Sequence, residues 1–158
     1  VREVYNNAWS KNWGFVPMTP EEINYIANDL KQIAREELIL LAERDHRPIA
    51  FSMTLPNINE VLIKIRNGRL FPTGFLTLLT GLKKVTTCRV ITLGVVRELQ
   101  TIGLGAVLYL ETILRARKLG MAAGEMSWIL EDNQAMNSSI AMFGSSLHKK
   151  YRIYQQKF

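Results

Sequence analysis

The sequence has little cysteine and no long apolar run. Cys88 is the only cysteine among 158 residues, so no internal disulfide can form, and a reducing cytoplasmic compartment is the simplest expectation. No uninterrupted apolar stretch approaches the roughly 18 residues that a membrane-spanning helix needs. Residues 1–10 also lack the apolar segment of a signal peptide. We therefore expect a cytoplasmic chain with no transmembrane segment, in which Cys88 is a small core residue.

Several signatures of ligand binding are also missing. No Lys-Ser or Lys-Thr pair follows Gly103 and Gly105, which excludes a Walker A loop. No G-x-G-x-x-G lies near the chain start with an acidic residue about twenty positions later, which argues against a dinucleotide-binding fold. Zinc-ligand spacing, a helix-turn-helix signature and the aromatic-basic strand motif of RNA-binding sheets are absent. We therefore expect neither a metal nor a nucleic-acid partner.

The composition is that of a globular protein with an excess of positive charge. The chain is 47% hydrophobic and 22% charged, with a formal net charge of +6, and its length favours one domain spanning residues 1–158. The charge suits an anionic ligand, nucleic acid or a membrane surface. Residues 148–158 hold four cations and no acid, a pattern typical of a solvated basic edge strand.

Hydrophobic periodicity predicts an alternating order of helices and strands. Apolar spacing indicates a helix from residue 1, and Thr19, Pro20, Glu21 and Glu22 are typical of a helix start. Strands at 37–44 and 47–55 are expected to form a hairpin, and further strands follow at 88–96, 122–130 and around 151–154. Helices are expected at 102–119 and at 133–143, the second capped by Asp132 or Asn133. The economical packing is an α/β fold, a mixed sheet with helices on both faces.

A glycine turn separates the strand at 88–96 from the helix that follows. Gly103 and Gly105 open that helix, and glycine permits positive φ and a close approach of a ligand to the backbone. Free N–H groups and the helix dipole favour a bound phosphate at such a position. A tight turn that binds no ligand is the alternative interpretation.

This stretch resembles the acyl-CoA-binding motif of the GNAT superfamily, the Gcn5-related N-acetyltransferases. The matching positions of the motif are Val95, Glu98, Gln100, Gly103 and Gly105, while Arg97 replaces the usual Pro. A second motif of the family, a strand followed by Asn, a helix and Gly-Phe, is similar to the segment that contains Asn133 and Gly144. The order of elements along nearly the whole chain also fits.

The resemblance implies a GNAT-like, mostly antiparallel sheet in which splayed strands 88–96 and 124–130 form an acyl-CoA cleft. The chain also resembles the C-terminal GNAT-like half of longer bacterial proteins. The first strand of the family should precede the first helix, yet this chain begins at Val1 with helical spacing. We therefore expect that strand to be missing and the sheet edge beside residues 37–44 to be open. A preceding domain or a homodimer would pair with that edge.

The resemblance further implies a co-substrate, acetyl-CoA or another acyl-CoA, and an amine acceptor. Backbone groups of Leu93 and Val95 would hold the pantetheine arm, with Val96 also among the cofactor-binding residues, and Asn133 would contact the arm. One backbone N–H near Leu93 to Val95 would polarise the thioester. The remaining predicted cofactor-binding residues lie in the glycine turn: Gln100, Thr101, Ile102, Gly103, Leu104, Gly105 and Ala106.

The catalytic groups are less defined. The usual Tyr that protonates the leaving thiolate is replaced by Ile140. The candidates for the base are Glu125, Glu131 and Asp132, although the last two could simply cap the following helix. Tyr151 and Tyr154 could supply the acid or could pack in the last strand. We take Glu131 as the base and Tyr151 as the acid.

An insertion at residues 57–87 precedes the glycine strand. Between Asn57 and Arg89 the sequence has six basic residues, and its single acid is Glu60. A basic, apolar lid indicates an acceptor or acyl group that is bulky and either lipid-like or acidic. The alternatives are that it covers the sheet or forms a dimer contact. A non-catalytic acyl-CoA-binding domain, or a structural half of a tandem protein, is the alternative to an N-acyltransferase.

Overall fold

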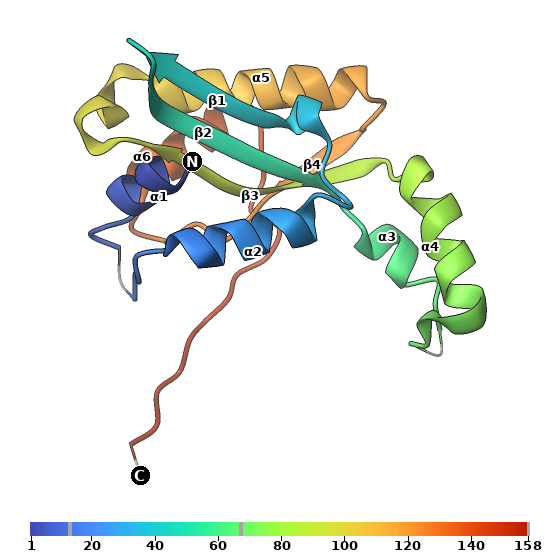
Figure 1. Ribbon diagram of the computed structural model, residues 1–158. Helices are drawn as coiled ribbons and strands as arrows, with labels where there is room; N and C mark the ends of the chain where they lie inside the picture. The colour runs from blue at the N-terminus through green and yellow to red at the C-terminus, as the bar shows by residue number, and fades with distance from the viewer. Residues whose placement is uncertain (13, 67, 158) are drawn as a thin grey trace. The chain divides into compact units, whose positions relative to one another are not determined.

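The computed structural model describes residues 1–12, 14–66 and 68–157. The chain divides into two compact units, Val1–Trp128 and Ile129–Phe158. The first unit contains a four-stranded sheet in the order β1, β2, β3, β4 (Figure 1). The strands are β1 (Ile39–Arg44), β2 (Arg47–Pro56), β3 (Thr87–Val95) and β4 (Ala123–Met126). The β1–β2 and β2–β3 pairs are antiparallel and β3–β4 is parallel, which confirms the predicted mixed sheet.

Helices cover both faces of this sheet (Figure 1). Phe51 of β2 contacts Trp9, which ends helix α1 (Arg2–Ala8), with ring centroids 6.0 Å apart. The next residue, Ser52, lies 3.5 Å by its hydroxyl from that of Thr112 in helix α5 (Leu104–Lys118). Because successive strand residues point to opposite faces, α1 and α5 lie on opposite sides of β2, as predicted.

The core joins the strands to α5. Cys88, Leu38, Ala116 and Met121 form one buried cluster, and Leu38 ends the short helix η1 (Glu36–Leu38). Cys88 is buried and burial raises the pKa of its thiol, which suits the predicted core role. Within the described ranges, the helices are all too short or too polar to cross a membrane.

Helix α2 (Pro20–Leu30) begins where the sequence predicts. The Thr19 hydroxyl accepts a hydrogen bond from the Glu22 N–H at 3.2 Å, and the Glu22 carboxylate accepts one from the Thr19 N–H at 2.8 Å. This reciprocal cap satisfies two of the free N–H groups at a helix start. None of the residues of α2 is buried, however, so its apolar side is not part of the core.

The first strand pair is the predicted hairpin. Its turn places Asp45 and His46 at positive φ, the geometry of a two-residue connection. β1 is a terminal strand of the sheet, and the segment Arg2–Ala8 is helical rather than a strand beside it. Pairing of β1 with a preceding domain or a second copy stays a prediction.

The insertion folds as a helical arm, which we define as residues 57–87. It contains α3 (Asn59–Leu62), η2 (Leu70–Gly74), α4 (Phe75–Gly81) and η3 (Leu82–Lys84). In Figure 1 the arm extends from the end of the sheet at which β2 ends and β3 begins.

The second unit departs from the prediction. Helix α6 (Gln134–Met142) is present, but the predicted last strand is wrong, since none of residues 145–157 is in a strand; Phe158 lies outside the described residues. Tyr151, Ile153 and Tyr154 are exposed. Alternation alone does not make a strand without a partner edge, and the cations of this segment bind a carboxylate instead. In the first unit, the predicted strand 122–130 is also shorter and spans only Ala123–Met126.

The contact between α1 and β3 generates a prediction about Gly94. A Cβ added at Gly94 would overlap the Trp9 ring atoms Cζ3 and Cη2. We therefore expect Gly94→Ala to lower the free energy of unfolding by about 1–3 kcal/mol through overpacking. Urea denaturation followed by circular dichroism measures this change. Trp9→Leu, which makes room, should recover part of the loss in the double mutant; equal midpoints for wild type and Gly94→Ala would contradict the prediction.

Candidate functional site

The site lies where β3 and β4 part. β3 pairs with β2 along most of its length, but its register with β4 runs only from Thr87 to Val90. The Ser127 N–H donates to the Val90 carbonyl at 3.1 Å and closes this ladder. In the described part of the chain, no strand residue pairs with β3 on that side after Val90.

A β-bulge accompanies the parting of the strands. Met53 pairs with Thr92 and Thr54 pairs with Val90, so Ile91 is an extra residue on β3. A bulge bends its strand and increases the local twist. It follows directly after the last residue that pairs with β4, so the bend and the end of pairing coincide.

Alternate backbone groups of β3 beyond the bulge point toward the side that has no strand partner. The Val96 N–H donates to the Ile49 carbonyl at 2.8 Å, toward β2. Because the direction of these groups alternates along an antiparallel strand, Leu93 and Val95 direct theirs away from β2. The predicted ligand-binding residues Leu93 and Val95 therefore have the required direction. The Val96 N–H, also among the predicted cofactor-binding groups, is used within the sheet.

The turn after β3 is braced from two sides. The Gln100 Nε2 donates to the Val95 carbonyl at 3.1 Å, so this predicted cofactor-binding side chain joins the strand end to the turn. The Arg97 N–H donates to the Asn7 Oδ1 of α1 at 2.9 Å. These bonds fix the short helix η4 (Arg97–Ile102), which contains the predicted residues Thr101 and Ile102.

Gly103 and Gly105 play different parts at the start of α5. Gly103 has φ +83° and caps the helix, a conformation that favours glycine. A Cβ added at Gly105 would lie 3.9 Å from Leu93 Cδ2 and 4.0 Å from Val95 Cγ2, which is ordinary contact. Packing therefore tolerates a side chain at Gly105, and the fold does not explain the glycine.

The N–H groups at the start of α5 are suited to binding an anion. The first N–H groups of an α-helix have no acceptor within the helix, and here they belong to Leu104 and Gly105. The next one, from Ala106, donates to the Gly103 carbonyl at 3.0 Å, so it is partly used. The arrangement presents donors and the positive end of the helix dipole immediately after β3.

A charged pair lies across the paired part of β3 and β4. Arg89 and Glu125 are opposite each other in register, with Arg89 Nε 3.9 Å from Glu125 Oε2 and 2.7 Å from Ser127 Oγ. Cys88, the neighbour of Arg89, packs toward α5, so Arg89 projects from the other face. Arg89 is thus part of the sheet rather than of the basic lid with which the sequence analysis grouped it.

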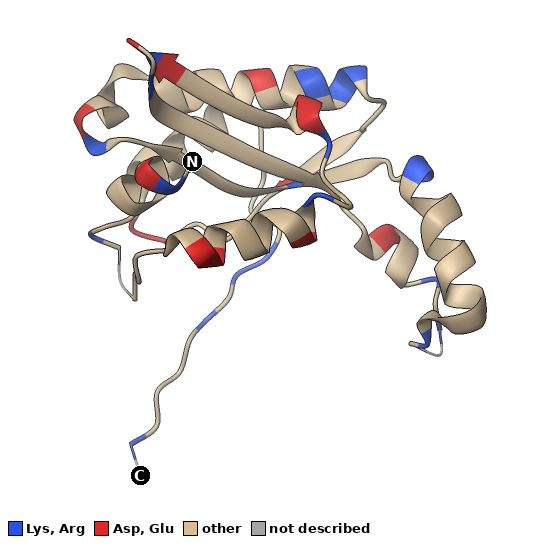
Figure 2. Cartoon of the chain, in the orientation of Figure 1, with Lys and Arg blue, Asp and Glu red and all other residues tan. Residues whose placement is uncertain are grey.

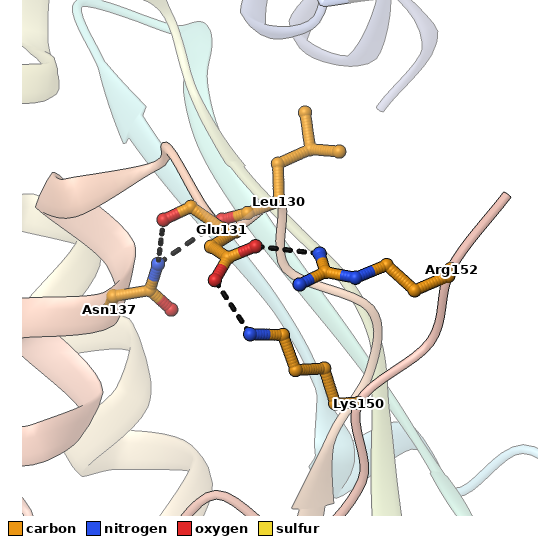
Figure 3. Close-up of polar contacts among 5 residues, drawn as sticks. All are labelled: Leu130, Glu131, Asn137, Lys150 and Arg152. Carbon is orange, nitrogen blue, oxygen red and sulfur yellow. Dashed lines mark hydrogen bonds and ion pairs between the residues drawn. The ribbon is translucent and has the colours of Figure 1, made fainter.

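In the second unit, Glu131 is held by two cations (Figure 3). Its carboxylate accepts hydrogen bonds at 2.8 Å from Lys150 Nζ and at 2.8 Å from Arg152. These bonds, that of Arg152 first, lower the pKa of Glu131 to about 2. A carboxylate with so low a pKa is ionised at neutral pH and is a weak proton acceptor. Its role as the base stays a prediction.

The other predicted residues of this unit have defined local surroundings. Asn133 caps α6, with its Oδ1 accepting from the Met136 N–H at 3.2 Å, as one of the two sequence alternatives predicted. Asn137 donates to the carbonyls of Leu130 and Glu131 (Figure 3). Tyr151 is exposed, and its role as the acid stays a prediction. Among the residues that the structure describes, no three His, Cys, Asp or Glu side chains gather in a metal-binding group.

The residue missed by sequence reasoning is Arg89. Its position opposite Glu125 depends on the register of β3 with β4, and on the face that it occupies before the bulge. No local signal in the sequence indicates either. The contact of Asn7 with the turn joins residues ninety positions apart in the sequence, so no local signal indicates it either.

Two curated bacterial proteins are similar in sequence. The chain is 40% identical over 163 residues to Protein YghO of Escherichia coli and 35% identical over 162 residues to the bacterial ceramide synthase of Caulobacter vibrioides. Each match covers 99% of this chain, but the chain spans only 42% of the length of each relative. No protein-family profile matches the chain.

Solved structures with a similar fold are acetyltransferases. An aminoglycoside 6'-N-acetyltransferase of Acinetobacter haemolyticus aligns with a TM-score of 0.59 and 15% identity, over 99% of this chain and 89% of that one. A ribosomal-protein alanine N-acetyltransferase of Escherichia coli aligns with a TM-score of 0.56 and 16% identity, over 90% and 67%. The fold of the chain is therefore that of the GNAT acetyltransferases, as its motifs predict.

Proposed function

We propose that the chain is an acyl-CoA-dependent N-acyltransferase domain. The observation that carries this proposal is the side of β3 that has no strand partner, where the backbone groups of Leu93 and the Val95 N–H point away from β2 beside the start of α5. The Val95 carbonyl on this side already accepts a hydrogen bond from Gln100 Nε2. An extended pantetheine arm can add to such an edge as a strand would. The diphosphate of CoA suits the helix N-terminus that follows in the chain.

The proposed reaction needs few groups. The amine nitrogen attacks the thioester carbon, the C–S bond breaks, and the amine proton leaves while the thiolate gains one. A backbone N–H between Leu93 and Val95 would stabilise the negative charge on the carbonyl oxygen. The N–H groups from Thr101 to Ala106 would hold the diphosphate, and Asn133 would contact the pantetheine arm.

Two carboxylates are candidates for the base. Glu125 lies on β4 next to the point where the strands part, whereas Glu131 is ionised and tied to Lys150 and Arg152. The acid is Tyr151 or water, since Ile140 replaces the family Tyr. We favour Glu125 over Glu131, because the low pKa of Glu131 makes it a weak proton acceptor.

The proposed substrates include a long apolar chain. One relative is named a bacterial ceramide synthase, and a ceramide is an amide of a fatty acid and a long-chain amino alcohol. The helical arm of this chain is basic and has exposed apolar side chains, which suits a lipid-like acyl group or amine. Both observations favour a fatty acyl-CoA and a long-chain amine over acetyl-CoA and a small polar amine.

Thiol release tests the function directly. The chain is mixed with acetyl-CoA or palmitoyl-CoA and with either a long-chain amino alcohol or a small polar amine, and free CoA is measured. We expect amine-dependent release, greatest with the long-chain pair. Release that does not depend on the amine, together with no binding of any acyl-CoA by calorimetry, would reject the proposal.

The second candidate is a non-catalytic acyl-CoA-binding domain. The observation that favours it is the pair of weak catalytic positions, Ile140 in place of Tyr and a Glu131 carboxylate of low pKa. In that case acyl-CoA binds, but no amine increases thiol release. The same two measurements therefore separate the two functions.

Gly105 gives a prediction in which binding and stability separate. Gly105→Ala adds a methyl group at the proposed diphosphate site without a clash inside the fold. We expect CoA affinity to fall at least tenfold, about 1.4 kcal/mol, while the unfolding free energy is unchanged or rises by up to about 1 kcal/mol. Calorimetry and urea denaturation measure the two quantities. Leu110→Ala, at an exposed position of the same helix, is the control and should bind CoA normally.

The proton donors and acceptors can be distinguished by substitution. We expect Glu125→Gln to lower kcat by about 10²-fold, the scale of general base catalysis, and Glu131→Gln to lower it less. Tyr151→Phe should lower kcat by a similar 10²-fold if a side chain protonates the thiolate. Steady-state thiol release measures all three variants. A loss below about threefold in Tyr151→Phe would indicate that water supplies that proton.

A further inference from the structure

The helical arm holds itself together largely by its own contacts. α4 packs against α3, η2 and η3. Gly81 lies so close to α3 that an added Cβ would be 2.5 Å from Val61 Cγ1, and Val61 is fully buried. The arm is therefore a compact helical unit with an outer surface of its own.

The only carboxylate of the arm is used at its base. Glu60 accepts hydrogen bonds from the Thr86 N–H at 3.1 Å, the Thr87 N–H at 2.8 Å and both threonine hydroxyls. The Asn57 N–H donates to the Thr87 carbonyl at 2.9 Å. These bonds tie the two ends of the arm together at the start of β3. The single negative charge of the arm therefore lies at its base, where it is already hydrogen-bonded.

The outer surface of the arm has many exposed apolar side chains. Ile63 is 80% exposed, Phe71 72% and Leu76 63%. Phe71 and Phe75 stack with ring centroids 5.7 Å apart. Four more side chains contribute to this apolar face, each at least 40% exposed: Leu62, Leu70, Phe75 and Leu79. Seven exposed apolar side chains in one short segment indicate an interaction surface.

Positive charge borders the apolar face. Within the helical arm, Figure 2 shows Lys and Arg near both ends of α4 and acidic colour only on α3. These cations come from the two connections around the apolar face, and each is exposed: Lys64, Arg66, Arg69, Lys83 and Lys84. A basic border around exposed Phe, Leu and Ile is the composition of segments that lie in the headgroup region of a membrane.

We propose that the helical arm docks the chain on the surface of an anionic lipid bilayer. The apolar face enters the headgroup and acyl-chain boundary, and the five cations bind lipid phosphates. α4 has seven residues, about 10 Å of helix, so it fits within the interface rather than across the bilayer. Docking does not depend on acyl transfer, since it needs neither CoA nor an amine.

Charge argues against a second copy as the occupant of this face. Two arms packed face to face would bring ten cations together with only the two Glu60 carboxylates, which are already hydrogen-bonded. An anionic bilayer instead offers a negative charge for each cation and an apolar interior for the exposed rings. The bilayer thus satisfies both features of the surface at once.

Vesicle flotation tests the proposal with the 158-residue chain. Vesicles of phosphatidylcholine and phosphatidylglycerol in equal amounts are compared with vesicles of phosphatidylcholine alone at 0.1 M salt. We expect at least tenfold stronger partitioning to the anionic vesicles, weakened by 0.5 M salt because of screening. Absence of binding to anionic vesicles, or equal binding to both, would overturn the proposal.

Two sets of variants separate the apolar face from the charge. The apolar variant carries Ile63→Asn, Phe71→Ser and Leu76→Gln. Its control has three exposed apolar residues changed elsewhere in the first unit: Val16→Asn, Tyr25→Ser and Leu114→Gln. We expect partitioning of the apolar variant to fall at least tenfold and that of its control to stay within twofold. An unchanged apolar variant would overturn the proposal.

The charge variant carries Lys64→Gln, Arg66→Gln, Lys83→Gln and Lys84→Gln, and its control carries Lys11→Gln, Lys31→Gln, Arg44→Gln and Arg47→Gln. We expect the first set to lose at least tenfold in binding to anionic vesicles and the control to lose less than threefold. Equal losses would show that binding depends on net charge alone and would overturn the assignment.

Circular dichroism and gel filtration check the fold and the oligomeric state of each variant. A wild-type dimer that becomes monomeric only in the apolar variant, with no vesicle binding by wild type, would assign the face to a second copy instead.

Discussion

The extra residue Ile91 on β3 is the constraint on which the rest of the site depends. A regular strand would keep its edge beside β4 and fill its hydrogen bonds within the sheet. The bulge bends β3 directly after Val90, the last residue paired with β4. The extra residue also shifts the alternation along the strand, so that the backbone groups of Leu93 and Val95 point away from β2.

The bent strand is supported by a helix from the start of the chain. Trp9 covers Gly94 on the face opposite α5, while Asn7 binds the Arg97 N–H at the turn. On the other face, Gly105 lies over Leu93 and Val95 without crowding them. The proposed ligand edge thus has one tightly packed face and one face with space to spare. Such an arrangement keeps the geometry of the edge while leaving access to it.

The sequence predicts those parts of the fold that depend on local chemistry. The cap at Thr19, the left-handed Gly103 and the Asn133 cap each follow from the conformational preference of a residue and its immediate neighbours. The prediction of a last strand was wrong, because the alternation of residues around Tyr151 does not show whether a neighbouring strand is available for pairing. The bulge at Ile91 could not be predicted either, since it is defined only by the register of β3 with β2. Local signals therefore located the candidate site, but the pairing that opens it required the structure.

The buried position of Cys88 gives the molecule an internal reporter. Its thiol lies at the beginning of β3, packed against the C-terminal part of α5 beside Ala116 and Met121, and 3.8 Å from the Ala123 carbonyl of β4. A reagent can modify it only when this end of the sheet opens, because burial both blocks access and raises the pKa of the thiol. The rate of modification would therefore report how often β3, β4 and α5 separate at this end of the sheet. No other cysteine in the sequence competes for the reagent. The Cys88 thiol thus makes local opening of the β3–β4 pair measurable with a thiol-specific reagent.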